Sequence, residues 1–228
     1  MKGIYPRPVR DIHQIELSTR CNLRCKYCPH FPELPRPKTD MDEPTYRAAL
    51  DLVRYYVAQG TQTELSLTGI GEAALHPRFV EYVGWARAAL GPDRPLTVTT
   101  NGLLLDDNLC AQLAPHKVQV FVSLHRPEKA GFAVEAAKRA GILAGVNASF
   151  ATSAFNWAGQ QKNWFVSAPK IPCEYLRAGW GVIMVDGRVT TCCLDATGAG
   201  VIGAVWDDPE TLMLKPYSLC ESCHMEVP

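Results

Sequence analysis

Three cysteines near the start of the chain are spaced so that they can hold a metal centre. They are Cys21, Cys25 and Cys28, in the pattern C-x3-C-x2-C. A loop this short brings three thiolates together, and thiolates are ligands of both iron–sulfur clusters and zinc. On a four-iron cluster, three cysteines leave one iron without a protein ligand, and that iron can bind and activate a small molecule. The spacing therefore predicts a reactive centre.

A structural zinc site is the alternative for these cysteines. His30 lies two residues after Cys28 and would supply the fourth ligand that a closed zinc site needs. However, zinc knuckles rarely combine a spacing of three residues with one of two. The cysteines also follow the first predicted strand directly, and active sites of α/β folds lie at such strand ends. Both points favour the iron–sulfur interpretation.

A second group of cysteines lies in the last third of the chain. Its members are Cys173, Cys192, Cys193, Cys220 and Cys223. The stretch 181–193 predicts a hairpin with Asp186-Gly187 as a two-residue turn. On such a strand Cys192 and Cys193 point to opposite faces, so only one of them can reach a shared metal. From spacing alone, a small zinc ribbon and a second iron–sulfur cluster both suit this group.

The overall composition is that of a folded protein without a strong electrostatic partner. Of 228 residues, 47% are hydrophobic and 20% are charged, with 23 basic and 23 acidic side chains. A zero net charge argues against a broad nucleic-acid surface or an anionic membrane. We find no apolar run of membrane-spanning length, and residues 1–10 lack the apolar segment of a signal peptide. We therefore expect a cytoplasmic protein, whose nine cysteines bind metal instead of forming disulfides.

The elements that position the first cysteines alternate between strands and helices. Strands are expected at 13–18, 64–67, 96–100, 118–124 and 145–150, and helices at 42–57, 77–90, 106–113 and 128–140. This alternation predicts βαβ units and a parallel sheet. The fold class is α/β: a partial (β/α) barrel of about five parallel strands and four helices, followed by a small hairpin-based domain. We place the barrel at 1–155 and the second domain at 156–228.

The chain resembles the radical S-adenosylmethionine (radical SAM) enzymes. The resemblance rests on C-x3-C-x-aromatic-C after the first strand and covers nearly the whole chain. It implies that S-adenosylmethionine binds the open iron of a [4Fe–4S] cluster held by Cys21, Cys25 and Cys28. One electron then cleaves the cofactor, and a 5′-deoxyadenosyl radical takes a hydrogen atom from the substrate. It further implies an external one-electron reductant of the flavodoxin or ferredoxin type.

The resemblance also assigns residues to the cofactor. Gly71-Glu72 is similar to the end of the Gly-Gly-Glu motif, although this chain has Gly-Ile-Gly-Glu. Glycine lets the backbone approach the ligand, and glutamate offers an acceptor to its ammonium group. Tyr27 is expected near the adenine. Asn101 and Ser123, which end the third and fourth strands, are expected to contact the cofactor as well.

The second group resembles the SPASM/Twitch extension of radical SAM enzymes. The matching pattern is C-x13-G-x4-C followed by C-x2-C, which makes Cys192 a ligand together with Cys173, Cys220 and Cys223. This implies a second, auxiliary [4Fe–4S] cluster that is saturated by four thiolates and therefore transfers electrons. The small dehydrogenases that oxidise an aminocyclitol are similar in form. The substrate stays open: a sugar-like molecule, a peptide, a nucleotide or a base. So do two remoter alternatives, a two-cluster electron carrier and a zinc protein.

Overall fold

The computed structural model describes residues 4–31, 33–147, 157–161 and 171–228. A single eight-stranded sheet runs through it. In spatial order its strands are β10 (Val201–Ala204), β9 (Arg188–Thr190), β8 (Trp180–Ile183), β2 (Asp11–Ile15), β3 (Leu65–Leu67), β4 (Leu96–Thr100), β5 (Gln119–Ser123) and β6 (Leu143–Asn147). Strands β8 and β2 to β6 are parallel to one another, whereas β9 and β10 pair antiparallel.

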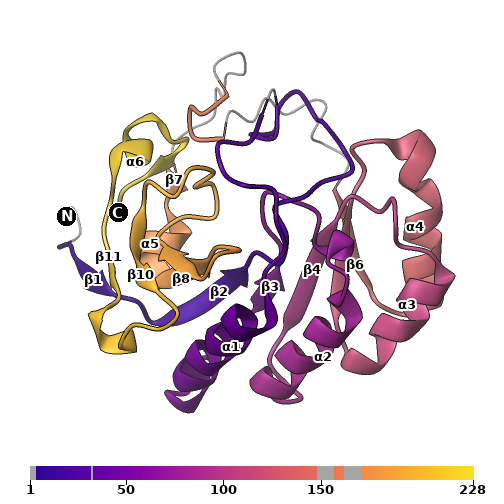
Figure 1. Cartoon of the computed structure of the whole chain (residues 1–228), viewed down its shortest axis with the longest axis horizontal. Coiled ribbons are helices and arrows are strands. Elements are labelled where there is room, and N and C mark those ends of the chain that lie inside the picture. Colours follow the sequence, from indigo (N-terminus) through magenta and orange to yellow (C-terminus); the bar gives the residue numbers. More distant parts are fainter. Residues whose placement is uncertain (1–3, 32, 148–156, 162–170) are drawn as a thin grey trace.

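Four helices cover one side of the parallel strands (Figure 1). They are α1 (Glu43–Ala58), α2 (Phe79–Leu90), α3 (Asp107–Leu113) and α4 (Pro127–Arg139). Local sequence explains where they begin. The Asp42 carboxylate caps α1 by accepting from the Thr45 amide, and Asp106 caps α3 through the Leu109 amide. Pro127 begins α4, where a missing N–H is tolerated.

The predicted partial barrel is confirmed. All five predicted strands are present as β2 to β6, and all four predicted helices as α1 to α4. The first strand ends at Ile15 instead of Ser18, and the end of the last predicted strand lies partly outside the described residues. The strands β3 and β4 are almost entirely buried, because helices cover one face of the sheet and the barrel interior fills the other.

The predicted hairpin is also present, but it extends the barrel sheet. Its first strand, β8, pairs in parallel with β2, from Asp11↔Trp180 to Ile15↔Ile183. This adds a sixth parallel strand to the five predicted. The hairpin loop is longer than the predicted two residues: the Met184 amide donates to the Arg188 carbonyl, and Gly187 adopts a φ of +81°.

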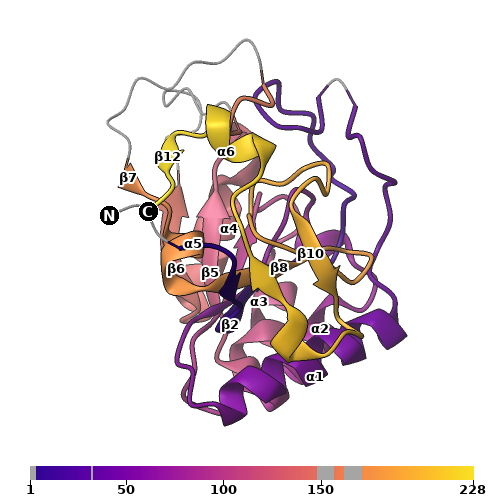
Figure 2. The same cartoon turned by 90° about the vertical axis from the view of Figure 1, so that its left-hand side faces the viewer.

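Short elements complete the C-terminal part. They are β1 (Arg7–Pro8), β7 (Ile171–Pro172), β11 (Met213–Leu214), β12 (Met225–Glu226), α5 (Glu174–Ala178), α6 (Ser218–Ser222) and the 3-10 turns η1 (Ala73–Leu75), η2 (Ala114–His116) and η4 (Pro209–Thr211). Strand β1 pairs with β11 and β7 with β12, so α6, β12 and β7 lie together (Figure 2).

The two predicted domains share one hydrophobic core. It includes Ile12 of β2 and Val53 of α1 together with Val189 of β9 and Leu214 of β11. The proposed boundary at 155/156 lies outside the described residues, so it stays a prediction. No helix within the described ranges is both long and apolar enough to cross a membrane.

Candidate active site

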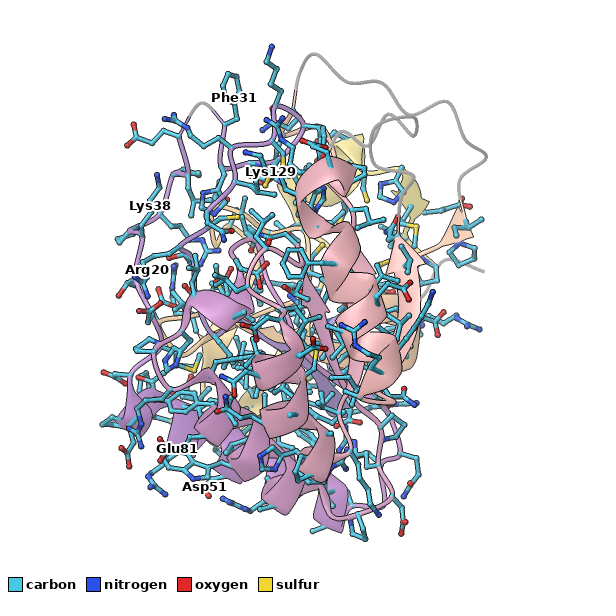
Figure 3. All side chains as sticks on the ribbon, turned by 90° about the vertical axis from the view of Figure 1, so that its right-hand side faces the viewer. Arg20, Phe31, Lys38, Asp51, Glu81 and Lys129 are labelled. Atoms are coloured by element: carbon cyan, nitrogen blue, oxygen red, sulfur yellow. The ribbon has the colours of Figure 1, made fainter. Side chains whose placement is uncertain are left out.

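A cavity of about 250 Å³ lies where the parallel strands end. The loop that follows β2, which carries the first cysteines, lies at this end of the sheet (Figure 1). Phe31 of that loop and Asp51 of α1 lie at opposite ends of the molecule (Figure 3). The predicted cofactor and first-cluster residues all line this cavity: Cys21, Cys25, Tyr27, Cys28, Gly71, Glu72, Asn101 and Ser123. Residues 102 positions apart in the chain thus meet in one site.

The first cysteine loop is held by backbone and side-chain hydrogen bonds. Thr19 Oγ1 donates to the Pro37 carbonyl at 2.7 Å and accepts from the Thr39 amide at 2.8 Å, which fastens the start of the loop to its end. The Leu23 amide lies 3.4 Å from Cys21 Sγ, an N–H···S contact of the kind that stabilises a thiolate ligand. Burial raises the pKa of Cys28 to about 12. Since metals bind the thiolate, loading this site must release protons.

Gly71 is required by a close approach of two backbones. A Cβ at Gly71 would lie 2.1 Å from the Ser18 carbonyl oxygen and 2.7 Å from that of Arg20. The next amide, that of Glu72, donates to the Arg20 carbonyl at 2.7 Å. The Gly-Glu segment is therefore pressed against the residues that lead into Cys21.

The Glu72 carboxylate is buried and bound by the end of the next strand. It accepts from Thr100 Oγ1 at 2.7 Å, the Asn101 amide at 2.7 Å and the Ala74 amide at 3.1 Å. Burial raises its pKa, while these hydrogen bonds oppose the increase. The sequence predicts Glu72 as an acceptor for the cofactor ammonium group. In the structure its carboxylate is occupied mainly in fixing Thr100 and Asn101.

Of the remaining predicted cofactor residues, Asn101 is hydrogen-bonded to another part of the protein and Ser123 is not. Asn101 Nδ2 donates to Asn22 Oδ1 at 2.7 Å, which joins β4 to the cysteine loop. The Ser123 hydroxyl is buried, lines the cavity and has no hydrogen-bond partner among the described residues. A buried hydroxyl without a partner is unfavourable. Ser123 is therefore a ready donor or acceptor for a bound molecule.

A hydrogen bond joins the cysteine loop to the loop that follows β5. The Tyr27 hydroxyl lies 2.7 Å from His125 Nδ1. Burial lowers the pKa of His125 and raises that of Tyr27, so both side chains are favoured in their neutral forms. The sequence does not pair these two residues, because no local pattern links residues on different loops.

The second cysteine group lines a separate, smaller cavity. Cys173, Cys192, Cys220 and Cys223 all line it, whereas Cys193 lines the first cavity, with its thiol next to Cys192 and Tyr175. This separation does not arise from strand alternation as predicted, because β9 ends at Thr190 and both cysteines lie in the loop that follows. The amides of Leu194 and Met225 lie 3.3 and 3.4 Å from the sulfurs of Cys192 and Cys223.

A short segment between the two cavities was not identified from sequence. Trp157 lines the first cavity and Ala158 the second. Their φ values are +50° and +56°, uncommon for residues other than glycine. Neighbouring side chains hold the segment in place: Gln161 Nε2 donates to the Cys28 carbonyl at 2.9 Å, and Ser222 Oγ donates to the Ala158 carbonyl at 2.6 Å. The segment therefore links both cysteine groups.

The sequence of the barrel identifies the family. Residues 15–143, which contain the first three cysteines and the Gly-Glu segment, match the radical SAM superfamily. The chain belongs to the radical SAM superfamily. Radical SAM proteins are enzymes that use a [4Fe–4S] cluster and S-adenosylmethionine, and the first cavity is lined by three cysteines and the unpartnered Ser123 hydroxyl.

Curated radical SAM relatives match only part of the chain. GTP 3′,8-cyclase 1 of Mycobacterium tuberculosis is 29% identical over 143 residues, which is 59% of this chain and 38% of the relative. The tungsten-containing aldehyde ferredoxin oxidoreductase cofactor-modifying protein of Pyrococcus furiosus is 33% identical over 105 residues, 44% of this chain and 26% of the relative. The chain thus spans well under half the length of these relatives.

Solved radical SAM structures match the fold over most of the chain. BtrN in complex with AdoMet and 2-DOIA superposes with a TM-score of 0.71 at 19% identity, covering 92% of this chain and 86% of BtrN. The enzyme anSMEcpe with AdoMet and the Kp18Cys peptide has a TM-score of 0.63 at 15% identity, covering 92% and 85%. These similarities extend the shared fold beyond the barrel into the C-terminal part.

Proposed function

We propose that this radical SAM enzyme dehydrogenates a small molecule and uses a second [4Fe–4S] cluster as electron acceptor. In this proposal a substrate alcohol loses a hydrogen atom from carbon to the 5′-deoxyadenosyl radical that cofactor and first cluster supply when bound. It then loses one electron to the auxiliary cluster and its hydroxyl proton to water, which leaves a ketone. Cys173, Cys192, Cys220 and Cys223 hold the acceptor.

One observation carries this proposal: adjacent residues face the two cavities. Cys193 lines the first cavity and Cys192 the second, and Trp157 and Ala158 repeat this arrangement. At two places, residues that are adjacent in the chain therefore line different cavities. A substrate radical in the first cavity would lie close to a ligand of the auxiliary cluster, which favours direct electron transfer.

The arrangement of the thiols favours clusters over zinc. Within the described ranges, no three His, Cys, Asp or Glu side chains converge so closely that they could hold one metal ion. A structural zinc site needs four ligands at about 2.0–2.3 Å from a single ion. A four-iron cluster is larger, and its ligands are correspondingly further apart. Four thiolates around one cavity fit such a cluster and leave it closed to substrate.

Residues of the barrel would position S-adenosylmethionine. Gly71 brings the backbone of the Gly-Glu segment against the cysteine loop, and the bound Glu72 carboxylate fixes Asn101. Ser123 offers its unpartnered hydroxyl. Cys193, Leu194 and Trp157 line the side toward the second cavity, where the substrate would sit.

The lining of the first cavity argues against an anionic nucleotide substrate. Its described residues include no lysine or arginine, the side chains that usually bind phosphate groups. The similarity to GTP 3′,8-cyclases in the barrel therefore supports shared radical chemistry more than a shared substrate. The BtrN structure holds the small molecule 2-DOIA, and a small polar molecule of this kind suits a mostly apolar cavity with a few polar groups.

The test separates the two clusters by mutation. Anaerobically reconstituted protein is incubated with S-adenosylmethionine and dithionite, first alone and then with 2-deoxy-scyllo-inosamine and related aminocyclitols as probes. We expect 5′-deoxyadenosine from the native chain and none from Cys25→Ala. Cys223→Ala should still form 5′-deoxyadenosine but lose oxidised product. If a folded Cys223→Ala protein oxidises a probe at the native rate, the electron-acceptor role is wrong.

A further inference from the structure

The cavity that holds four cysteines also contains a buried tyrosine hydroxyl. Tyr217 lines this cavity beside Cys192 and Cys220. Its hydroxyl oxygen is buried and makes no regular hydrogen bond within the described chain, but it lies close enough to the Cys192 thiol for the two groups to interact. A buried tyrosine hydroxyl almost always has a partner, because leaving it unpaired is unfavourable. The partner of this hydroxyl is therefore expected to be the Cys192 sulfur or a group bound beside it in the cavity.

The loop after Cys193 is shaped to receive the Tyr217 ring. A Cβ at Gly200 would lie 2.6 Å from two carbons of that ring, so only glycine allows the ring this close. Gly200 is in turn fixed by Asp195, whose Oδ2 accepts from the Gly200 amide at 2.8 Å and from Thr190 Oγ1 at 2.7 Å. The other carboxylate oxygen accepts from the amides of Gly198 and Ala199. Asp195 therefore determines where the phenol lies.

We propose that Tyr217 donates a hydrogen bond to a sulfur of the auxiliary cluster and so raises the cluster's reduction potential. This inference rests on the proposed function, since it requires a cluster in the second cavity. Thiolate and sulfide sulfurs accept hydrogen bonds, and such bonds are among the factors that set the potential of iron–sulfur clusters. Reduction adds negative charge to the sulfurs. The hydrogen bond therefore stabilises the reduced form more than the oxidised form.

A higher reduction potential of the auxiliary cluster would favour the electron transfer in the proposed reaction. The auxiliary cluster must accept an electron from a substrate radical while a strong reductant supplies the first cluster. The Tyr217 hydroxyl would make electron acceptance more favourable without changing any ligand. The amide contacts of Leu194 and Met225 to the sulfurs of Cys192 and Cys223 would also raise the potential.

The test measures the potential of the auxiliary cluster in the full-length, two-cluster protein. Potentiometric titration is followed by electron paramagnetic resonance, and added S-adenosylmethionine identifies the first cluster by changing its signal. Tyr217→Phe should keep its iron content but lower the auxiliary potential by about 59 mV, equivalent to tenfold in the constant for one-electron reduction. Tyr56→Phe is the matched control, because its hydroxyl lies outside both cavities and contacts the Pro209 carbonyl.

A second variant keeps the hydroxyl but moves it. Gly200→Ala places a methyl group against the Tyr217 ring, so it should also lower the potential of the auxiliary cluster. If the Tyr217→Phe protein incorporates little iron, the potential of the Gly200→Ala protein tests the role of Tyr217 instead. Two clusters with an unchanged auxiliary potential in these variants would refute the role of Tyr217 alone. A native protein that binds only one cluster would instead refute the proposed function itself.

Discussion

Arg36 and Glu16 form a two-pronged ion pair inside the protein. Their Nη1–Oε2 and Nη2–Oε1 distances are 2.8 and 3.0 Å, and both side chains are 4% exposed. Arg36 Nε also donates to the Ala196 carbonyl at 2.8 Å, while Glu16 accepts from the amide of Ile70. The pair thus joins the cysteine loop, the Gly-Glu segment and the loop that carries Cys192.

Removing one member of this pair should be strongly destabilising. Arg36→Met leaves the Glu16 carboxylate buried without its counterion, and we expect a loss of about 3–5 kcal/mol in the free energy of unfolding. The double variant Glu16→Gln/Arg36→Met should lose less than the sum of the single variants. Anaerobic urea denaturation measures all three. Additive losses would show that the two side chains act independently.

Gly71→Ala should damage both stability and cofactor binding. The added methyl group meets backbone carbonyls that cannot rotate away, so we expect a loss of at least about 1–3 kcal/mol and little binding of S-adenosylmethionine. Gly131→Ala is the matched control, because Gly131 lies within α4 with no atom near its Cβ position. That change should stabilise the protein by roughly 0.5–1 kcal/mol. Equal effects of the two substitutions would rule out the close approach at Gly71.

Ser123→Ala tests whether the unpartnered hydroxyl contacts the cofactor. Because the hydroxyl makes no hydrogen bond within the described chain, its removal should leave the unfolding free energy nearly unchanged. Loss of one hydrogen bond to ligand should weaken S-adenosylmethionine binding by about 2- to 10-fold, from roughly 0.5–1.5 kcal/mol. Calorimetry on the reconstituted protein measures this. Ser66→Ala, on β3 and outside the cavity lining, is the control; the same affinity in both variants would contradict a contact at Ser123.

Metal analysis tests both cysteine groups at once. The reconstituted protein should hold about eight irons and eight sulfides, as two four-iron clusters. Replacing Cys21, Cys25 and Cys28 with Ala should leave about half, because the four cysteines of the second cavity are untouched. Cys193→Ala should keep the full iron content, since Cys173, Cys192, Cys220 and Cys223 all remain around the second cavity. Zinc in the first site, or iron lost on changing Cys193, would overturn the assignment.

His76 predicts a dependence of stability on pH. His76 Nε2 lies 2.9 Å from the Met41 carbonyl, and its Nδ1 accepts from the Arg78 amide at 3.1 Å. Burial lowers its pKa. Below about pH 6.5 the unfolded chain therefore takes up a proton that the folded form resists, so stability falls as the pH decreases. His76→Gln should show a shallower decrease between about pH 7 and 5 in denaturation experiments; an identical slope would exclude this contribution.

Local patterns were sufficient to predict most of the barrel. Helix periodicity and caps such as Asp42 and Asp106 are encoded within a few residues. The position of β8 was not predictable in this way, because a strand's second neighbour depends on residues about 170 positions away, at β2. Nor was the Cys192–Cys193 loop, since strand alternation was extended three residues past the end of β9.

The sequence predicted which residue types form the candidate site, but not which of its side chains contact one another. Cysteine spacing and strand-end polar residues located the first cavity. Glu16 was assigned to a strand without a role, although a carboxylate between Ile15 and Leu17 is a signal that a buried partner exists. Trp157 left no such signal, because its surroundings have no periodicity and its role depends on loops far away in sequence.

The parallel pairing of β8 with β2 has a practical consequence for dissecting this protein. Without residues 180–183, the backbone N–H and C=O groups along one side of β2 would be left without partners. An open strand edge of this kind is a template on which other chains assemble. A fragment trimmed to the part that matches the superfamily, residues 15–143, would also cut β2 itself. Such a fragment is expected to aggregate. In the whole chain, the C-terminal hairpin covers the edge of β2 and thereby prevents self-association at that edge.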